Sequence, residues 1–331
     1  MGNPVFITGD IARQVFDWRD AVAALQAVYA QPFGPGACPP RIVAQQGPSW
    51  LRALPSNPPG CRYFGAKLMG AAMNVAQPSV DYVIVLFDRE TSRIAGFLDA
   101  NLVTAYRTAA TSASAFDKLA PHKPLRLGVI GSGLEASMHT RAFSAMRDLE
   151  EVAVYSTTPA RREAFAQKLS DELGLPVRPA ATPQEAVGDA DIVLTAARSH
   201  DETPILFADW LPEKAMVVSI GSTIPQQREI DASVIARADL IVCDMLEEVL
   251  HETGDMLAAV ANGIDVSSRA ISLNDLMNGS ASDRVAAAQR PMFKSVGGGV
   301  QDVVVGGAIL DRAIAAGLAA PLPFQFEGKA L

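Results

Sequence analysis

The chain has 331 residues, a formal net charge of −8, 49% hydrophobic residues and 19% charged residues. This length suggests about two domains, and the large apolar share excludes an intrinsically disordered chain. The negative charge disfavours a nucleic acid or an anionic membrane surface as a partner. Three scattered cysteines and four histidines show no metal-ligand or disulfide spacing, and no apolar run is long enough to span a membrane. The N-terminal residues lack a signal-peptide pattern, so we expect a cytoplasmic protein without a metal site.

The first third of the chain mixes helices with strands, which predicts an α+β domain over residues 1–120. Helical periodicity favours helices at 10–30 and at Asn101–Leu119. Prolines and glycines predict a loop at 47–60. Apolar stretches predict strands, the last two of which flank Asp88–Ser92 as a β-hairpin: Arg41–Ala44, Tyr63–Met69, Tyr82–Phe87 and Arg93–Leu98.

From residue 125 onward, short apolar strands alternate with helices. The predicted strands are Leu125–Ile130, Glu151–Ser156, Val177–Ala180, Asp191–Ala196, Met216–Ile220, Leu240–Asp244 and Phe293–Val296. The predicted helices are one opening near Leu134, then Ala160–Leu173, Pro183–Val187, Glu247–Ala261 and Asp302–Gly317. This alternation predicts a doubly wound parallel sheet over 121–298, with its ligand at the carboxyl ends of the strands. We expect the last helix, within 302–331, to return to the first domain.

A glycine-rich turn joins the first strand of this second domain to its helix. The turn reads Gly131, Ser132, Gly133, Leu134, Glu135, Ala136. The first glycine permits a tight turn, the second lets the backbone approach a pyrophosphate, and the alanine lets helix and strand pack closely. The helix N-terminus presents N–H groups to the phosphates. The turn therefore predicts a dinucleotide site, with an ordinary glycine turn as the alternative.

The end of the next strand indicates which dinucleotide is preferred. An acidic residue there would bind the adenosine ribose and repel a 2′-phosphate. This chain has instead Ser156, Thr157 and Thr158, followed by Arg161 and Arg162. Hydroxyls and guanidinium groups suit a phosphate, so we expect NADP(H) to be preferred, with NAD(H) possible. The alternative is that the two arginines are simply solvated helix residues.

Basic residues in apolar surroundings suggest a binding site for a carboxylate. Arg41 and Lys67 lie in predicted strands, and Arg107 lies on a helix face of small residues. Arg41 could clamp a carboxylate, Lys67 beside another cation would have a lowered pKa and could handle a proton, and Arg107 could reach a carboxylate or the pyrophosphate. The alternative is that the strand cations are solvated at a sheet edge.

These features together resemble the ornithine cyclodeaminase/mu-crystallin family. The matching segments are Arg41-Ile-Val, Gly65-Ala-Lys67 with Asn74, the hairpin ending at Thr91, Leu102–Ala110, Gly131-Ser-Gly133, Ile220–Pro225 with Arg228–Asp231, and Phe293–Gly297 with Asp302. The resemblance implies a homodimer with an N-terminal substrate-binding and dimerisation domain and a Rossmann-type domain that binds NAD(P). It places the substrate carboxylate on Arg41 and Lys67. It places the cofactor on Ser79, Arg107, Gly131–Ala136, Ser156–Thr158, Ser219 and Ser295, Val296 and Gly297.

One departure from the family pattern affects the expected reaction. The cyclodeaminase and an alanine dehydrogenase of this family carry an aspartate where this chain has Thr223, and threonine cannot act as a general base at neutral pH. The leading hypothesis is that the protein is an NADP(H)-dependent imine or ketimine reductase, or an amino-acid dehydrogenase. Arg41 and Lys67 would hold the carboxylate of a small imino or amino acid, and Lys67 or water near Thr223 would manage the proton. The alternatives are an ornithine cyclodeaminase-type ammonia lyase with bound NAD and a crystallin-like carrier of NADPH and a small ligand.

Overall fold

The computed structural model describes residues 3–73, 76 and 79–329, so Asn74 lies outside the described residues. The chain divides into two compact units, which we call unit 1 (Met1–Arg107 and Gly298–Leu331) and unit 2 (Thr108–Gly297). The division falls inside helix α3 (Ala100–Leu119), whereas the sequence placed a boundary at the Pro-rich break near residue 120. No helix among the described residues is long and apolar enough to cross a membrane.

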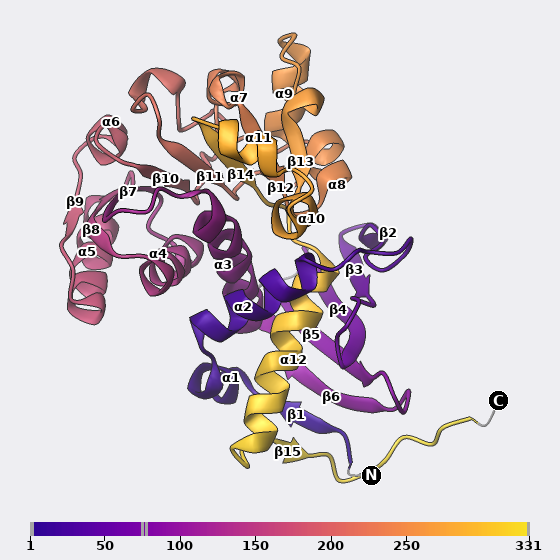
Figure 1. Ribbon diagram of the computed structural model, residues 1–331. Coiled ribbons are helices and arrows are strands. Elements are labelled where there is room, and N and C mark those ends of the chain that lie inside the picture. The colour runs from indigo at the N-terminus through magenta and orange to yellow at the C-terminus, as the bar shows by residue number, and fades with distance from the viewer. Residues whose placement is uncertain (1–2, 74–75, 77–78, 330–331) are drawn as a thin grey trace. The chain divides into compact units, whose positions relative to one another are not determined.

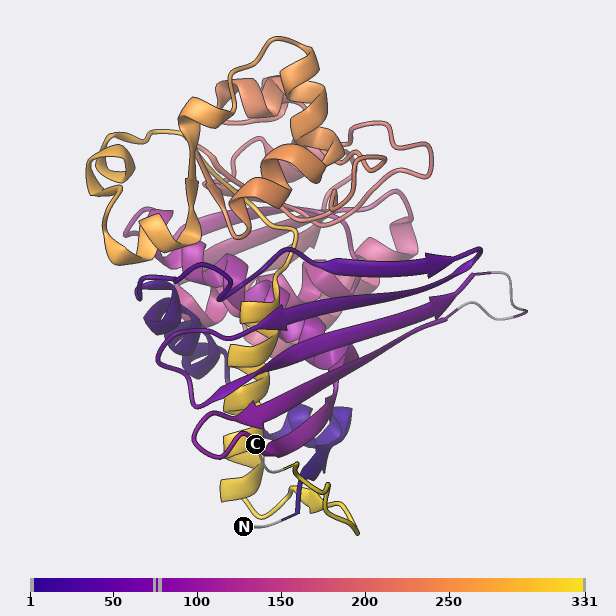
Figure 2. The ribbon, with the colours of Figure 1, turned by 90° about the vertical axis from the view of Figure 1, so that its right-hand side faces the viewer.

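Unit 1 contains a mixed sheet with strand order β15-β1-β6-β5-β4-β3-β2. The strands are β1 (Val5–Ile7), β2 (Ile42–Gln46), β3 (Ser49–Ser56), β4 (Tyr63–Ala72), β5 (Ser79–Asp88), β6 (Ile94–Asp99) and β15 (Ala320–Pro321). Strands β2 to β6 are antiparallel neighbours, as Figure 2 shows for the long ribbons of this sheet. The predicted hairpin at Asp88–Ser92 is confirmed by the pairing of β5 with β6.

Helix α12 (Gly299–Ala315) covers one face of this sheet and packs against β3 to β6 and against two N-terminal helices, α1 (Gly9–Val15) and α2 (Trp18–Tyr29) (Figure 1). The helix approaches the strands closely because small residues face them. A Cβ atom at Gly299 would lie 2.6 Å from the carbonyl oxygen of Leu54 and 2.7 Å from that of Pro55. Packing of the C-terminal helix on these strands brings its first turn against residues more than two hundred positions earlier in the chain.

Two sequence predictions in unit 1 are wrong. Residues 47–60 were expected to be a loop, but β3 pairs with both β2 and β4. Pro48 lies in the turn that joins β2 to β3, and Pro55 lies beyond the end of β2, where no ladder hydrogen bond is required of it. The single helix expected at 10–30 is two helices, because Phe16 is extended and the Asp17 side chain accepts from the Asp20 N–H, which starts α2.

Unit 2 is a Rossmann-type, doubly wound parallel sheet with strand order β13-β12-β14-β11-β10-β7-β8-β9. The strands are β7 (Leu125–Ile130), β8 (Leu149–Tyr155), β9 (Val177–Pro179), β10 (Ile192–Thr195), β11 (Met216–Ser219), β12 (Leu240–Cys243), β13 (Ala270–Ser272) and β14 (Pro291–Lys294). The strand order reverses between β7 and β10, which is where such sheets bind nucleotides. Strand β14 comes late in the chain but lies between β11 and β12.

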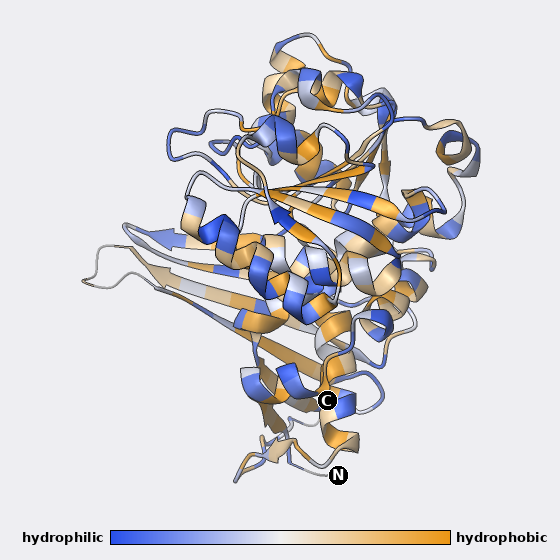
Figure 3. Cartoon of the chain, turned by 90° about the vertical axis from the view of Figure 1, so that its left-hand side faces the viewer, coloured by the Kyte–Doolittle hydropathy of each residue, from blue (hydrophilic) through white to orange (hydrophobic). Residues whose placement is uncertain are grey.

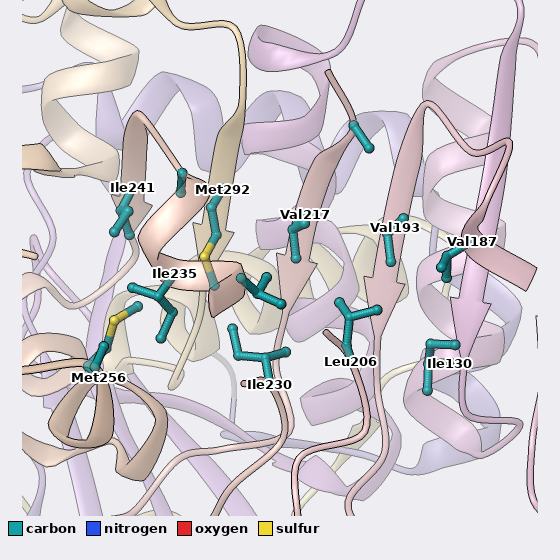
Figure 4. Close-up of a cluster of buried hydrophobic side chains, with 14 of the residues drawn as sticks. Ile130, Val187, Val193, Leu206, Val217, Ile230, Ile235, Ile241, Met256 and Met292 are labelled. Atoms are coloured by element: carbon teal, nitrogen blue, oxygen red, sulfur yellow. The ribbon is translucent and has the colours of Figure 1, made fainter. Parts of the chain in front are cut away.

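The core of unit 2 is formed by strands that are apolar on both faces, and Figure 3 shows orange, apolar strands in this part of the chain. Figure 4 shows one layer of this core, in which Ile241, Met292, Val217 and Val193 lie on successive strands. Residues from the connecting segments, including Leu206, close the layer. The rigid sheet fixes where each of its loops begins.

The helices of unit 2 surround this sheet. They are α4 (Leu134–Met146), α5 (Pro159–Leu173), α6 (Pro183–Val187), α7 (Ala232–Arg237), α8 (Leu246–Glu252), α9 (Gly254–Ala261), α10 (Leu273–Asn278), α11 (Ser282–Ala287), and two 3-10 turns, η1 (Ala208–Trp210) and η2 (Ser267–Arg269). The single helix predicted at Glu247–Ala261 is wrong. Thr253 is extended there, and the Asp255 carboxylate accepts the backbone N–H groups of Glu229 and Ile230, so α9 starts in a new direction.

Candidate active site

Lys67 lies buried in the middle of the sheet of unit 1. It pairs with Leu54 on β3 and with Ile84 on β5, and its side chain is 1% exposed. Its Nζ atom donates to Asp302 Oδ1 at 2.9 Å and lies 3.5 Å from Thr104 Oγ1. The alternative of a solvated edge-strand lysine is therefore excluded for Lys67.

Arg107 meets the same carboxylate. It is 6% exposed, its Nε lies 3.0 Å from Asp302 Oδ1, and its Nη1 donates to Gln301 Oε1 at 2.8 Å. Gln301 Nε2 in turn donates to the Tyr29 hydroxyl at 3.2 Å. Two consecutive residues in the first turn of α12 thus hold the guanidinium through different nitrogens. We call Lys67, Arg107 and Asp302 the charged triad.

The triad holds two cations and one anion in a buried environment. The pKa of Lys67 is lowered to about 8, first by burial and then by the charge of Arg107, while Asp302 acts in the opposite direction and Arg52 lowers it slightly. The direction of this shift agrees with the expectation for a lysine beside another cation, although burial lowers the pKa more than the Arg107 charge does. Lys67 remains mostly protonated at pH 7, so the triad carries a net positive charge suited to an incoming carboxylate.

The other two predicted residues of unit 1 are placed differently. Arg41 is partly exposed and directly precedes β2, whose first residue, Ile42, pairs with Ala53 on β3. Ser79 is exposed at the start of β5 and pairs with Ala72, five residues along β4 from Lys67 or about 17 Å. The sheet thus separates Ser79 from Lys67, and Arg41 lies just outside the paired residues of β2.

The glycine turn of unit 2 has the backbone that a dinucleotide requires. Gly131 has φ +114°, and a Cβ atom on it would lie 2.7 Å from the carbonyl oxygen of Ala196. Gly133 is the N-cap of α4, has no capping side chain, and has open space where a Cβ would project. Ala136 is fully buried, while Ser132, Leu134 and Glu135 are at least partly exposed. The space at Gly133 and the uncapped N–H groups of α4 fit a pyrophosphate.

The segment after β8 shows a difference between its two arginines. Arg162 Nη1 donates to the Ser156 carbonyl at 2.9 Å, and its guanidinium lies 5.8 Å from the centre of the Tyr155 ring. Arg161, Thr157 and Thr158 are exposed at the start of α5. Thr158 is the N-cap of α5 without a side-chain capping hydrogen bond. Arg161 is therefore the better placed of the two arginines for an external phosphate.

A fully buried polar network lies below the carboxyl ends of β11 and β14. Lys294 Nζ donates to Ser219 Oγ at 2.9 Å and to Asp255 Oδ2 at 3.1 Å, and Ser219 Oγ donates to Glu229 Oε2 at 2.6 Å. Glu229 also accepts the backbone N–H groups of Ala197 and Gly221. Burial raises the pKa of Glu229, against which the Lys294 charge acts. The predicted residue Ser219 therefore uses its hydroxyl inside the protein.

We expect Lys294→Met to lower the free energy of unfolding by about 3–5 kcal/mol, because it removes the buried cation that donates to Asp255 and leaves this carboxylate only Arg228, whose Nε lies 3.5 Å away. Urea unfolding followed by circular dichroism measures this loss. The control is Lys168→Met on the exposed side of α5, which we expect to change stability by less than about 0.5 kcal/mol. A loss for Lys294→Met as small as that of the control would contradict a structural role for the network.

The loop after β14 is held by Asp244. Its carboxylate accepts the Ser295 hydroxyl at 2.7 Å, the Val296 N–H at 3.0 Å and the Gly297 N–H at 2.9 Å. The predicted cofactor residues Ser295, Val296 and Gly297 are thus fixed at the carboxyl edge of the sheet. Thr223, the other predicted catalytic residue, donates its hydroxyl to Gln227 Oε1 at 3.0 Å.

The partners of the predicted cations were missed by sequence reasoning. Asp302 and Gln301 are polar residues in the apolar first half of the last helix, and Lys294 ends an apolar strand. That signal could have marked all of them as residues with a specific partner. Among the described ranges, no three His, Cys, Asp or Glu side chains gather so that they could hold a metal ion.

Comparison with known proteins places this arrangement in a family. Residues 21–317 match the model of the ornithine cyclodeaminase/mu-crystallin family. The chain belongs to this family. It is similar to a Delta(1)-pyrroline-2-carboxylate reductase of Bacillus cereus, with 29% identity over 82% of this chain and 84% of the relative. It is 31% identical to the mouse ketimine reductase mu-crystallin over 72% of this chain and 71% of the relative.

A solved structure agrees with this assignment. The structure of a probable ornithine cyclodeaminase from Bordetella pertussis Tohama I matches with a TM-score of 0.83 and 31% identity, covering 96% of this chain and all of that chain. Family membership confirms the resemblance drawn from the glycine turn and from the segments around Lys67 and Arg107.

Proposed function

We propose that the protein is an oxidoreductase that transfers a hydride between NADP(H) and a small imino or amino acid that carries a carboxylate. The observation that carries the proposal is the charged triad, in which two buried cations share one aspartate and keep a net positive charge. The glycine turn of unit 2 supports the dinucleotide. Two of the relatives named above are reductases of cyclic or ketimine-type imines, which supports the reaction.

The residues of unit 1 bind and orient the substrate in this proposal. Lys67 and Arg107 attract the substrate carboxylate, and Arg41, which directly precedes β2, adds a third cation of unit 1. The bound nicotinamide supplies the hydride that is added to the imine carbon. A protonated imine needs positioning more than a strong base, which agrees with a Thr223 hydroxyl that donates to Gln227.

The residues of unit 2 bind the dinucleotide. Gly131–Ala136 would hold the pyrophosphate at the N-terminus of α4. Thr157, Thr158 and Arg161 would face the adenosine ribose and its 2′-phosphate, whereas an acid that would repel this phosphate is missing. Ser295, Val296 and Gly297 would contribute the loop that Asp244 holds.

We expect Arg161→Ala to raise the KM for NADPH about tenfold or more while the KM for NADH stays within twofold, because a charge-assisted hydrogen bond to phosphate is lost. Steady-state rates with both cofactors measure the change. Lys168→Ala, another exposed cation of α5, is the matched control. Equal KM values for NADPH and NADH in the unaltered protein would contradict the NADP(H) preference.

The proposed reaction is tested by following NADPH oxidation with Δ1-pyrroline-2-carboxylate, with a six-membered cyclic imine carboxylate, and with 2-oxo acids plus ammonia or methylamine. Turnover of at least one imine supports the proposal. Ammonia release from ornithine without net formation of NADH would support a cyclodeaminase. Tight ligand binding without any change in NADPH absorbance across the panel would support a carrier.

We also propose a homodimer that forms through unit 1. All five residues of edge strand β2 are exposed, and Ile42, Val43 and Leu51 are large apolar residues exposed on the β2–β3 hairpin. Size-exclusion chromatography with light scattering gives the mass directly. A mass of one chain at micromolar concentration would contradict this part of the proposal.

A further inference from the structure

Asp302 uses only one of its two carboxylate oxygens. Oδ1 receives Lys67 Nζ at 2.9 Å and lies 3.0 Å from Arg107 Nε. Oδ2 is buried and has no hydrogen-bond partner among residues 3–73, 76 and 79–329. A buried carboxylate oxygen without a donor is costly, so such an atom calls for a specific explanation. A donor supplied by a ligand would satisfy it.

The chemistry of the triad indicates what this donor is. The nitrogen and the carboxylate of an α-amino or α-imino acid are separated by one carbon atom, so both groups fit beside charges that are about 3 Å apart. The triad holds an anion and two cations at that spacing. The cations match the carboxylate, and the remaining aspartate oxygen matches an N–H.

We propose that Asp302 Oδ2 accepts a hydrogen bond from the protonated imine nitrogen of the substrate, and that this contact makes the site reduce C=N bonds in preference to C=O bonds. The inference deepens the function proposed above and rests on it. It assigns Asp302 as a residue that determines specificity, in addition to holding Lys67 and Arg107.

The selectivity follows from where charge develops during reduction. When a hydride adds to the carbon of an iminium ion, the C=N π electrons move to a nitrogen that already carries its proton, and the product is a neutral amine that then takes a proton from water. When a hydride adds to a 2-oxo acid, the C=O π electrons move to oxygen, which becomes an alkoxide. A buried carboxylate at this position stabilises the iminium cation and repels the alkoxide.

A pair of ligands tests the contact in the unaltered protein. L-Proline and tetrahydrofuran-2-carboxylate have the same ring size and carboxylate, but the second has an ether oxygen in place of the N–H. We expect tetrahydrofuran-2-carboxylate to inhibit imine reduction with a Ki about 100-fold higher than that of L-proline, because a site built for a donor rejects an analogue that lacks it. Ki values within threefold of each other would overturn the inference.

Substitution of Asp302 tests the selectivity. We expect Asp302→Asn to lower kcat/KM for the cyclic imine about 100-fold more than kcat/KM for the matching 2-oxo acid, because the weaker hold on Lys67 and Arg107 affects both substrates alike. Gln301→Met is the matched control, because it loosens Arg107 without touching Asp302 Oδ2, and it should lower both rates in proportion.

The outcomes separate the inference from the proposed function. A protein that reduces no imine fails the proposed function itself. A protein that reduces imines, but whose Asp302→Asn variant loses both activities in equal proportion, fails only the inference about Asp302. If the Asp302→Asn variant does not fold, the ratio of the two Ki values in the unaltered protein still decides.

Discussion

Lys67→Met is expected to lower kcat/KM for the imino acid by about 10³-fold, and most of the loss should appear in KM. The variant removes a buried cation that the substrate carboxylate would contact, and it leaves Asp302 with Arg107 alone. Losing one partner of a buried charge pair costs about 4 kcal/mol, which corresponds to this factor. Initial rates of NADPH oxidation over a wide substrate range measure it.

The pH dependence gives this prediction a second readout. Lys67 has a pKa of about 8 in the folded protein, so its charge is present below pH 8 and is lost as the pH rises through that value. Log kcat/KM should be flat below pH 8 and fall by about one unit per pH unit above it. Lys67→Arg keeps the charge at every accessible pH and should show a lower rate without this alkaline decline. An unchanged decline in Lys67→Arg would assign it to another group.

The fold of unit 2 was predictable because its signals are local. Each strand is a short apolar run bounded by turn residues, and β7 and α6 begin and end where the periodicity placed them. The glycine turn could be recognised from consecutive residues, because the positive φ of +114° at Gly131 strongly favours glycine. Such features need no knowledge of distant contacts.

The errors lie where tertiary contacts overrode local pattern. Strand β3 contains Pro55, yet it pairs with β4 along its whole length, and Pro55 occupies a position where the strand on the other side, β2, has ended. Helix α2 begins after its N-cap residue, Asp17. The preceding residue, Phe16, stacks its ring on that of Tyr106, with 3.9 Å between the ring centroids. Spacing along the chain could not identify β4 as the partner of β3, or Tyr106 as the partner of Phe16.

The candidate site divides in the same way. Lys67 was recognisable because a lysine among apolar strand residues must have a reason to be buried. Its partner Asp302 is 235 residues away, and only the packing of α12 on β4 brings the two together. For the same reason the network of Lys294, Asp255 and Glu229 was missed, although Ser219 at its centre was predicted as a contact of the cofactor.

Gly133→Ala is expected to weaken NADPH binding about 100-fold without lowering stability. Gly133 has ordinary backbone angles (φ −86°, ψ −169°), and no atom lies within 4 Å of the position of an added Cβ. Alanine therefore fits the folded protein, and it should stabilise it slightly by restricting the unfolded chain. The methyl group would instead occupy the space through which the pyrophosphate approaches the backbone. Fluorescence titration with NADPH and thermal unfolding measure the two effects separately.

Gly131→Ala is the counterpart that separates a cofactor role from a folding role. At φ +114° an alanine is strained, and its Cβ would lie 2.7 Å from the Ala196 carbonyl oxygen, so we expect a loss of about 3 kcal/mol in the free energy of unfolding. The two substituted positions are two residues apart in one turn, yet Gly133→Ala should change the affinity for NADPH and Gly131→Ala should change the free energy of unfolding. Normal NADPH affinity in the Gly133→Ala variant would show that the pyrophosphate does not lie on this turn, and it would remove the dinucleotide site from the place that the sequence assigns to it.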